Sequence, residues 1–225
     1  MKWSQVACQQ SPDGLMVEAY KTSPEAKEYT YCIAGTHGDE VESVLVMHHW
    51  FNWLQDQKSL PNLMIIPVLN VDGLARGTRV NANGVDLNRN LPSSNWASDH
   101  SHERYFPGQW PLSEVENQFL SEMMKRYPAK QIISLHSWKP FLQYDDNRVS
   151  NLASYLSSKN GYDIVDGDID NHPTPGSLST WAQEVMDVPV LTIEFPEIDH
   201  HMSVSKIIND NMPAFKGLID DRVID

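Results

Sequence analysis

Four short apolar runs, separated by segments with a helical pattern, constrain the fold of this chain more than any other feature. Each run is rich in Ile, Val and Leu without alternating polar residues, which is typical of strands buried on both faces. The runs are Tyr29–Thr36, Leu63–Asn70, Gln131–His136 and Pro189–Phe195. The helical segments are Glu40–Gln55, Ser113–Arg126, Asn151–Ser158, Leu178–Val185 and Ser203–Leu218. This alternation predicts an α/β fold, a three-layer α/β/α sandwich around a mainly parallel, mixed sheet.

Length and composition narrow the class of protein further. The chain has 225 residues, 40% of them hydrophobic, and no internal repeat or linker-like segment, so we expect one domain spanning residues 1–225. No apolar run approaches the roughly 20 residues that span a bilayer, and Met1–Gln10 contains no apolar signal segment. Two cysteines, Cys8 and Cys32, cannot build a disulfide framework, so we expect a reducing, cytoplasmic setting.

The charge argues against two classes of partner. Lys and Arg number 17 against 30 Asp and Glu, which gives a formal net charge of −13. A chain of this sign repels phosphate backbones and anionic lipids, so we expect no nucleic-acid partner and no membrane partner. Charge and composition leave the oligomeric state open.

Polar side chains gather at the ends of the predicted strands. His37 follows the first run, Asn70 ends the second, His136 ends the third, and Glu194 lies near the end of the last. Open α/β sheets bind ligands in the crevice beyond the carboxyl ends of their strands. The sequence therefore predicts a binding or catalytic site at this edge of the sheet.

Three of these polar residues form a possible metal site. His37 and Glu40 are three residues apart at a strand-to-helix turn, so both side chains can face one cation. His136 would add a second imidazole, and two His with one carboxylate leave a coordination position for water, as in catalytic zinc sites. Taken separately, the first two residues also fit an exposed pair near a helix start, and His136 fits a hydrogen-bonded core histidine.

The segment between the second run and the next helix fits no regular element. It extends from Val71 to Leu112 and is rich in Gly, Pro, Asn and Arg. A connection of this length inside a compact domain is usually functional or disordered. The spacing of Ser113 and Glu116 after it is that of a capping box, which predicts a helix beginning at Ser113.

The order of these motifs resembles the zinc carboxypeptidase family related to carboxypeptidase A. The matching pieces run from residue 37 to residue 194: H-x-x-E at 37–40, N-V-D-G at 70–73, Arg79, D-L-N-R-N at 86–90, His136 and T-I-E at 192–194. One departure is Val71, where the family usually has Pro in a turn without a catalytic role. The resemblance implies a zinc carboxypeptidase-like fold and a hydrolase acting on a peptide or isopeptide bond.

The resemblance also implies roles for individual residues. His37, Glu40 and His136 would bind one zinc ion per chain. Glu194 would be the general base, and Arg79 would polarise the scissile carbonyl. Residues that would hold the carboxylate on the leaving side are Asn88 and Arg89, because a planar guanidinium can bind a carboxylate through two parallel hydrogen bonds. Residues expected to have a structural role in the loop are Asp86 and Asn90.

Further stretches resemble one branch of the family, the bacterial murein peptide amidases. They include A-G-T-H-G-D-E, T-P-G-S-L-S-T-W and T-I-E-F-P. The digestive enzymes carry a flexible Tyr before a Gly-Ser segment, whereas residues 171–177 contain none, so His172 is a candidate to replace it in substrate binding. This resemblance implies a small-peptide substrate, the murein tripeptide, cut between γ-D-glutamate and meso-diaminopimelate during recycling of cell-wall peptides.

Two alternative functions compete with this interpretation. One is a broader metallocarboxypeptidase or an N-acyl amino acid deacylase, because the aspartoacylase-like branch shares H-x-x-E and D-L-N-R. The continuation Asn90-Leu91-Pro92 favours the peptidase branch. The other is an inactive binding domain on the same fold. Such a domain would be expected to lose a zinc ligand or the catalytic Glu, and the sequence retains all of them.

Overall fold

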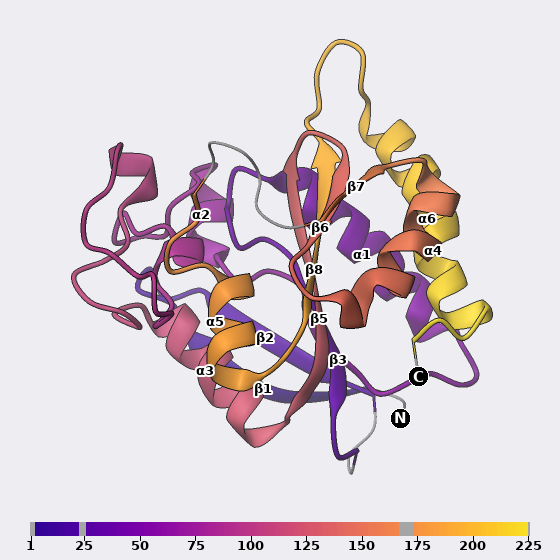
Figure 1. Cartoon of the computed structure of the whole chain (residues 1–225), viewed down its shortest axis with the longest axis horizontal. Helices are drawn as coiled ribbons and strands as arrows, with labels where there is room; N and C mark the ends of the chain where they lie inside the picture. The colour runs from indigo at the N-terminus through magenta and orange to yellow at the C-terminus, as the bar shows by residue number, and fades with distance from the viewer. Residues whose placement is uncertain (1–2, 23–25, 167–172, 225) are drawn as a thin grey trace.

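The computed structural model describes residues 3–22, 26–166 and 173–224, which form an α/β fold around one eight-stranded sheet (Figure 1). The strand order across the sheet is β1-β2-β4-β3-β5-β8-β6-β7. The strands are β1 (Ser4–Gln10), β2 (Met16–Lys21), β3 (Tyr29–Ile33), β4 (Leu63–Ile66), β5 (Ala129–Trp138), β6 (Phe141–Tyr144), β7 (Asp163–Asp166) and β8 (Val190–Pro196).

The centre of the sheet is parallel and its flanks are mostly antiparallel. Strands β4, β3, β5 and β8 pair in parallel, and these are the four runs that the sequence predicts as buried strands. The pair β1–β2 and the pairs β2–β4 and β6–β8 are antiparallel, whereas β7 adds to β6 in parallel. The sheet is therefore mixed with a parallel centre, as predicted.

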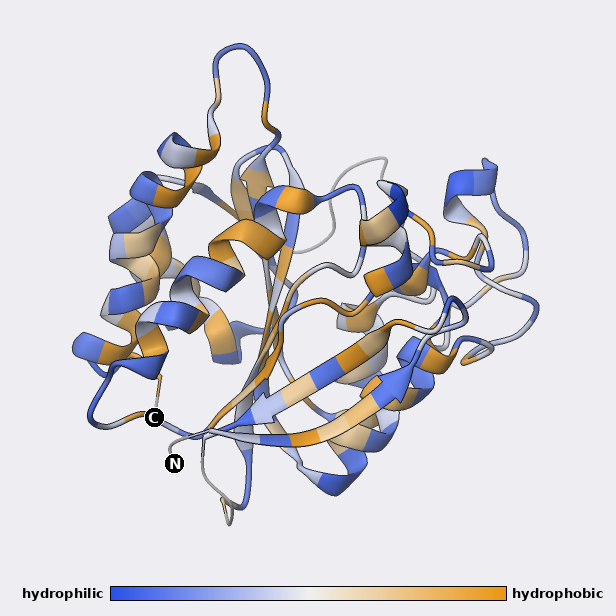
Figure 2. Ribbon diagram, turned by 180° about the vertical axis from the view of Figure 1, so that it is seen from behind, coloured by the Kyte–Doolittle hydropathy of each residue, from blue (hydrophilic) through white to orange (hydrophobic). Residues whose placement is uncertain are grey.

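Helices cover both faces of the sheet, which confirms the three-layer arrangement (Figure 1). One face packs against α1 (Val41–Gln55), α4 (Ser150–Asn160) and α6 (Val204–Asp220). The other face packs against α3 (Val115–Arg126) and α5 (Leu178–Met186). Hydrophobic residues concentrate in the central strands, and hydrophilic ones on the outer turns of the helices (Figure 2).

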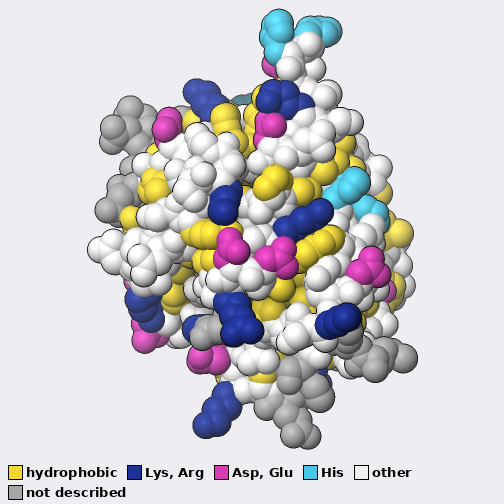
Figure 3. All heavy atoms as spheres, turned by 90° about the vertical axis from the view of Figure 1, so that its right-hand side faces the viewer, with side chains coloured by type: hydrophobic (Ala, Val, Ile, Leu, Met, Phe, Trp, Pro, Cys, Tyr) yellow, Lys and Arg dark blue, Asp and Glu magenta, His cyan; other side chains and the backbone are white. Residues whose placement is uncertain are grey.

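Each central strand divides its side chains between the two cores. On β3, Cys32 joins the core under α1 and α6, while Tyr31 and Ile33 join the core under α3 and α5. Both faces of these strands are buried, and this is why the four runs show no alternation of polar residues. The outer surface over α4 and α6 carries both acidic and basic side chains (Figure 3). None of the described helices is both long and apolar enough to cross a membrane.

Several elements differ from the prediction. The helix α2 (Val71–Arg76) lies inside the segment expected to be irregular, with Asn70 Oδ1 accepting from the Gly73 backbone N–H at 2.8 Å. Val71 is the first residue of this helix. Pro is common at this position, but a helix can begin without it. The flanking strands β1, β2, β6 and β7 were not predicted, because their sequences mix polar with apolar residues and form no continuous apolar run.

The predicted capping box at the start of α3 is wrong. The helix begins at Val115 after Glu114, without a side-chain cap. The Ser113 hydroxyl instead donates to Glu114 Oε1 at 2.6 Å, and both Glu116 oxygens accept from Asn81 Nδ2 at 3.3 Å. These groups are occupied in a contact between the helix and the long loop, so they are not available to cap the helix.

Candidate active site

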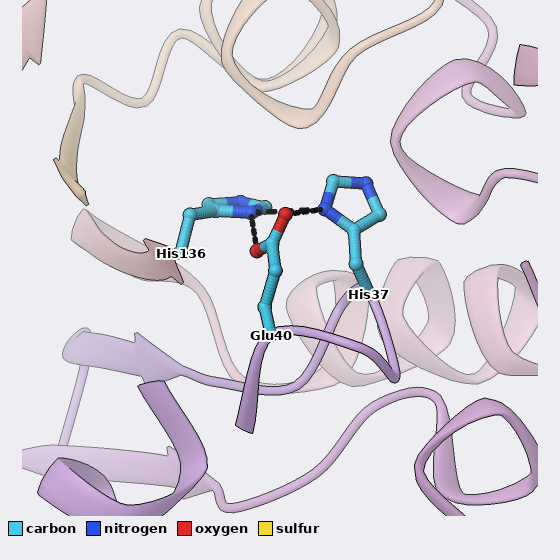
Figure 4. Close-up of side chains that lie close together, drawn as sticks. All are labelled: His37, Glu40 and His136. Atoms are coloured by element: carbon cyan, nitrogen blue, oxygen red, sulfur yellow. Dashed lines mark hydrogen bonds and ion pairs between the residues drawn. The ribbon is translucent and has the colours of Figure 1, made fainter. Parts of the chain in front are cut away.

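The three predicted metal ligands meet at the carboxyl ends of β3 and β5 (Figure 4). His37 lies in the turn after β3, Glu40 directly precedes α1, and His136 lies on β5. Glu40 Oε1 is 2.6 Å from His37 Nδ1, and Glu40 Oε2 is 2.9 Å from His136 Nδ1. One possible ligand atom from each residue lies within 4.8 Å of the others, and the described residues contain no second such group.

The opposite nitrogen of each imidazole is held by a second side chain. His37 Nε2 is 3.1 Å from Asp86 Oδ1, and His136 Nε2 is 3.1 Å from the Ser134 hydroxyl. Such partners fix the orientation of a ligating histidine and leave its other nitrogen directed at the metal. Asp86, expected to be only structural, therefore also contacts the candidate metal group. These contacts fit a metal site, because both imidazoles present Nδ1 to the same carboxylate.

The charges in this group depend on one another. Burial raises the pKa of Glu40, but the adjacent His37 and His136 outweigh burial and hold that pKa well below its usual range. Burial and Arg79 lower the pKa of His37, whereas Glu40 and Asp86 raise it, and the net pKa is raised. The group is thus two imidazoles around one ionised carboxylate, a donor set that suits zinc.

Glu194 lies beside the metal group through the pairing of β5 with β8. Its Cα is the register partner of the Cα of His136. Burial, with a smaller contribution from Glu40, raises the pKa of Glu194 to about 8, against the opposing effects of His136 and Arg79. Among the described residues, Glu194 Oε2 is buried without a hydrogen-bond partner. A carboxylate in this state can accept a proton from a small molecule that enters the site.

Contacts of both its side chain and its backbone hold Arg79 beside the metal group. Its Nε donates to Asp86 Oδ2 at 2.9 Å, and its Nη1 lies 3.4 Å from Glu40 Oε1. Its backbone carbonyl accepts from Asn70 Nδ2 at 3.0 Å and from the Gly38 N–H at 3.4 Å. Gly38 permits this contact, because a Cβ at that position would lie 1.9 Å from the backbone of Gly73.

Asn88 and Arg89 lie on a short 3₁₀ turn (Leu87–Arg89) at the same edge of the sheet. Asn88 Oδ1 accepts a hydrogen bond from the Leu178 N–H at 2.8 Å. This bond does not use the two hydrogens on Asn88 Nδ2. Arg89 Nη1 donates to the Asn88 carbonyl at 2.8 Å, and among the described residues no carboxylate lies within ion-pair distance of Arg89. Burial lowers the pKa of Arg89 and Arg79 lowers it further, against an opposing effect of Asp86. Arg89 can therefore take an external carboxylate.

A cleft of about 600 Å³ connects these groups. Behind Glu194, the sheet face carries a row of neutral polar side chains, because Ser134, Thr192 and Gln143 are register partners on β5, β8 and β6. Thr192 and Gln143 line the cleft. The lining also includes Thr174 and Ser177, whereas His172 lies outside the described residues.

The charged and aromatic side chains of one turn over the cleft were missed by the sequence prediction. Arg104 and Tyr105 lie on a second 3₁₀ turn (Glu103–Tyr105), and the Tyr105 ring has the guanidinium carbons of Arg79, Arg89 and Arg104 at 5.3, 5.7 and 5.6 Å. No periodicity or motif marks this turn in the sequence. Only the folded loop brings it over Arg79 and Arg89.

Comparisons with known proteins agree with this geometry. The zinc carboxypeptidase family (Peptidase_M14) matches residues 10–211. Murein peptide amidase A from Escherichia coli K12 is 31% identical over 194 residues, covering 81% of this chain and 77% of the relative. The Vibrio campbellii protein of that name is 32% identical over 199 residues, covering 83% and 75%.

Solved structures show the same fold. Murein-tripeptide amidase MpaA from Escherichia coli O157 superposes with a TM-score of 0.80 at 27% identity, covering 97% of this chain and 91% of that one. Bovine thrombin-activatable fibrinolysis inhibitor has the same fold at 19% identity, with a TM-score of 0.77 and coverage of 94% and 86%. The chain belongs to the zinc carboxypeptidase family. It is a hydrolase that acts on peptide bonds.

Proposed function

We propose that this chain hydrolyses the amide bond between γ-D-glutamate and meso-diaminopimelate in the murein tripeptide, with one zinc ion bound by His37, Glu40 and His136. We place this activity in the cytoplasm, in the recycling of cell-wall peptides, and assign residues 1–225 to one catalytic domain. The convergence of the two histidines and Glu40 beside Glu194 carries the proposal. The likeness to murein peptide amidases supports the choice of substrate.

Glu194 and Arg79 would perform the proton transfer and the charge stabilisation. Zinc supplies Lewis-acid chemistry, which makes water a nucleophile at neutral pH. The Glu194 carboxylate takes a proton from the attacking water and delivers it to the nitrogen of the leaving amine. Arg79, whose guanidinium is held by Asp86, faces the oxygen of the scissile carbonyl and stabilises the negative charge that develops there.

Asn88 and Arg89 would set which bond is cut. The α-carboxylate of diaminopimelate binds the Arg89 guanidinium and the free amide of Asn88, which places the neighbouring amide over Glu194. The distal end of diaminopimelate carries one ammonium and one carboxylate, and the neutral row with Thr192 and Gln143 suits such a zwitterion. We propose His172 as a further substrate contact.

Hydrolysis of defined tripeptides tests the proposal. With L-Ala-γ-D-Glu-meso-diaminopimelate, mass spectrometry should detect L-Ala-D-Glu and free diaminopimelate. Chelation of the metal should abolish the reaction, zinc should restore it, and elemental analysis should find about one zinc per chain. Comparable rates on the lysine tripeptide, or on ordinary α-linked dipeptides, would indicate a general carboxypeptidase. Activity that survives verified removal of metal would overturn the mechanism.

A further inference from the structure

Among the described residues that line the cleft, Arg104 is a cation that the proposed reaction does not use. Arg104 lines the cleft from the turn before Phe106, in the same loop as Arg79 and Arg89. Its side chain is 50% exposed, and its only charged partner among the described residues is Asp39, with 3.6 Å between Arg104 Nη2 and Asp39 Oδ2. That distance is too long for a hydrogen bond. The hydrogen-bonding capacity of this guanidinium therefore remains available to a ligand.

Tyr105 places Arg104 within reach of the proposed catalytic groups. The guanidinium carbons of Arg89 and Arg104 lie 5.7 and 5.6 Å from the centre of the same ring. They are therefore separated by at most roughly 11 Å, the two distances together. Arg79 lies 5.3 Å from that centre. A substrate whose carbonyl meets Arg79 and whose leaving carboxylate meets Arg89 can thus extend toward Arg104.

The chemistry of a γ-glutamyl substrate supplies a group for this cation. A γ-linkage leaves the α-carboxylate of glutamate free on the acyl side of the scissile bond, and an α-linked peptide has no such group there. Seven bonds join the two carboxyl carbons on either side of that amide, a span of at most about 9 Å at ordinary bond lengths. Two guanidiniums around one aromatic ring match this pair of carboxylates in number and charge, and the span of the carboxylates lies within the upper limit of the distance between the guanidiniums.

We propose that Arg104 is a specificity-determining residue that binds the free α-carboxylate of the γ-linked D-glutamate. This inference rests on the proposed function and deepens it. Arg104 selects γ-linked substrates on the acyl side of the bond, while Arg89 binds the carboxylate on the leaving side. The Tyr105 ring supports both guanidiniums through its face.

A matched pair of substrates tests this role. One is L-Ala-γ-D-Glu-meso-diaminopimelate, and the other carries a carboxamide in place of the glutamate α-carboxylate. With the unmodified protein we expect kcat/KM to be about tenfold higher on the acid, a value typical of one charge-assisted hydrogen bond at a half-exposed group. This preference should shrink at high salt, because exposed charges are screened.

Substitution of Arg104 should remove that preference. Arg104→Gln should bring the two kcat/KM values within about twofold of each other, and Arg104→Lys should retain an intermediate preference. The matched control is Arg148→Gln, an arginine of similar exposure (47%) outside the cleft, which should leave the tenfold preference intact.

The possible failures are distinguishable. Cleavage of both tripeptides without preference, or equal losses on both in Arg104→Gln, would overturn the role of Arg104 and leave the proposed function in place. Release of diaminopimelate from neither tripeptide by the zinc-loaded, unmodified protein would overturn the proposed function and the inference together.

Discussion

The ends of the central strands and the loop of residues 77–114 both bring side chains to the cleft, but they hold them differently. At the strand ends, backbone pairing sets the positions: His136 and Glu194 are register partners in the β5–β8 ladder. In the loop, side chains hold the backbone. Asn90 Nδ2 alone donates to the carbonyls of Pro107 and Trp110 and to the Ser113 hydroxyl, at 2.8–3.1 Å.

The loop depends on buried polar side chains to hold its backbone, whereas backbone pairing holds the central strands. Those with at most 2% exposure are Asn81, Asp86 and Asn90 in the loop, joined by Glu116 and Asn117 on α3, which contact it. Removing the partner of a buried polar group lowers the free energy of unfolding, because the group that remains is shielded from water and has no hydrogen bond. Substitution of Glu194 should therefore affect the chemistry and leave the fold intact, whereas substitutions of the buried polar residues that hold the loop should affect both.

The largest effect should come from Glu194→Gln at the strand ends. This change keeps size and removes the proton acceptor, so kcat should fall by at least about a hundredfold, in line with general-base contributions. Zinc content and Tm should stay close to those of the unmodified protein, because Oε2 has no partner to lose among the described residues. Loss of zinc in this variant would make Glu194 a ligand.

The second-largest effect should be a loss of stability in the loop variant Asn90→Ala. Removing the amide leaves several buried acceptors without a donor, so the free energy of unfolding should fall by about 3 kcal/mol. KM should rise as well, because Asn88 and Arg89 lie directly before Asn90. Urea denaturation measures the loss, with Asn52→Ala on the exposed side of α1 as the control. A loss below about 1 kcal/mol would show that the loop is held by other contacts.

A smaller change at Arg89 should separate binding from stability inside the same loop. Arg89→Gln should lower kcat/KM by about tenfold to a hundredfold, the range for a charge-assisted contact of about 1.5–3 kcal/mol. Its Tm should barely change, because the Arg89 side chain donates a hydrogen bond only to the Asn88 carbonyl among the described residues. Amidation of the diaminopimelate α-carboxylate should cause a similar loss in the unmodified protein. If Arg89→Gln lowers kcat/KM on the amidated substrate as much as on the free acid, the two effects are independent, and Arg89 does not bind that carboxylate.

The same contrast explains what the sequence could predict. The central strands are continuous apolar runs, and each predicted strand corresponds to one of β3, β4, β5 and β8. The carboxyl ends of parallel strands meet at one edge, so the convergence of His37 and His136 followed from that pattern alone. Arg79, Asn88 and Arg89 are different, because their expected roles depended on a resemblance of motifs and not on periodicity.

The features that were missed depend on contacts between distant side chains. Glu116 was read as part of a cap, but it contacts Asn81, 35 residues away in sequence. Arg104 and Tyr105 occupy a turn whose place over the cleft follows from the path of the whole loop. Local sequence carries no signal for such contacts, since the residues that satisfy each other are neither adjacent nor spaced by a regular period.

The smallest effect should be a change in the pH dependence of stability at Glu116, where the loop meets α3. Burial raises the pKa of Glu116 from its ordinary value of 4.5 to about 7, with smaller contributions from Glu114 and Asp72 and an opposing one from Asn81. Between these two pH values the unfolded chain releases the Glu116 proton while the folded chain keeps it. The folded state thus binds more protons there, and this contribution to stability decreases as the pH rises from 4.5 to 7.

Glu116→Gln mimics the protonated acid at every pH and can still accept from Asn81. The variant should match the unmodified protein near pH 4.5 and exceed its free energy of unfolding by roughly 2 kcal/mol at pH 8, below the roughly 3 kcal/mol that the full shift allows. Denaturation at both pH values measures the difference in free energy of unfolding between the variant and the unmodified protein. The contributions of the other titrating groups cancel in this difference. The control is Glu122→Gln on the same helix, whose side chain is 73% exposed and should give no pH-dependent difference. An equal stability difference at both pH values would show that Glu116 is ionised in the folded loop, and the contact with Asn81 would then be a charged one.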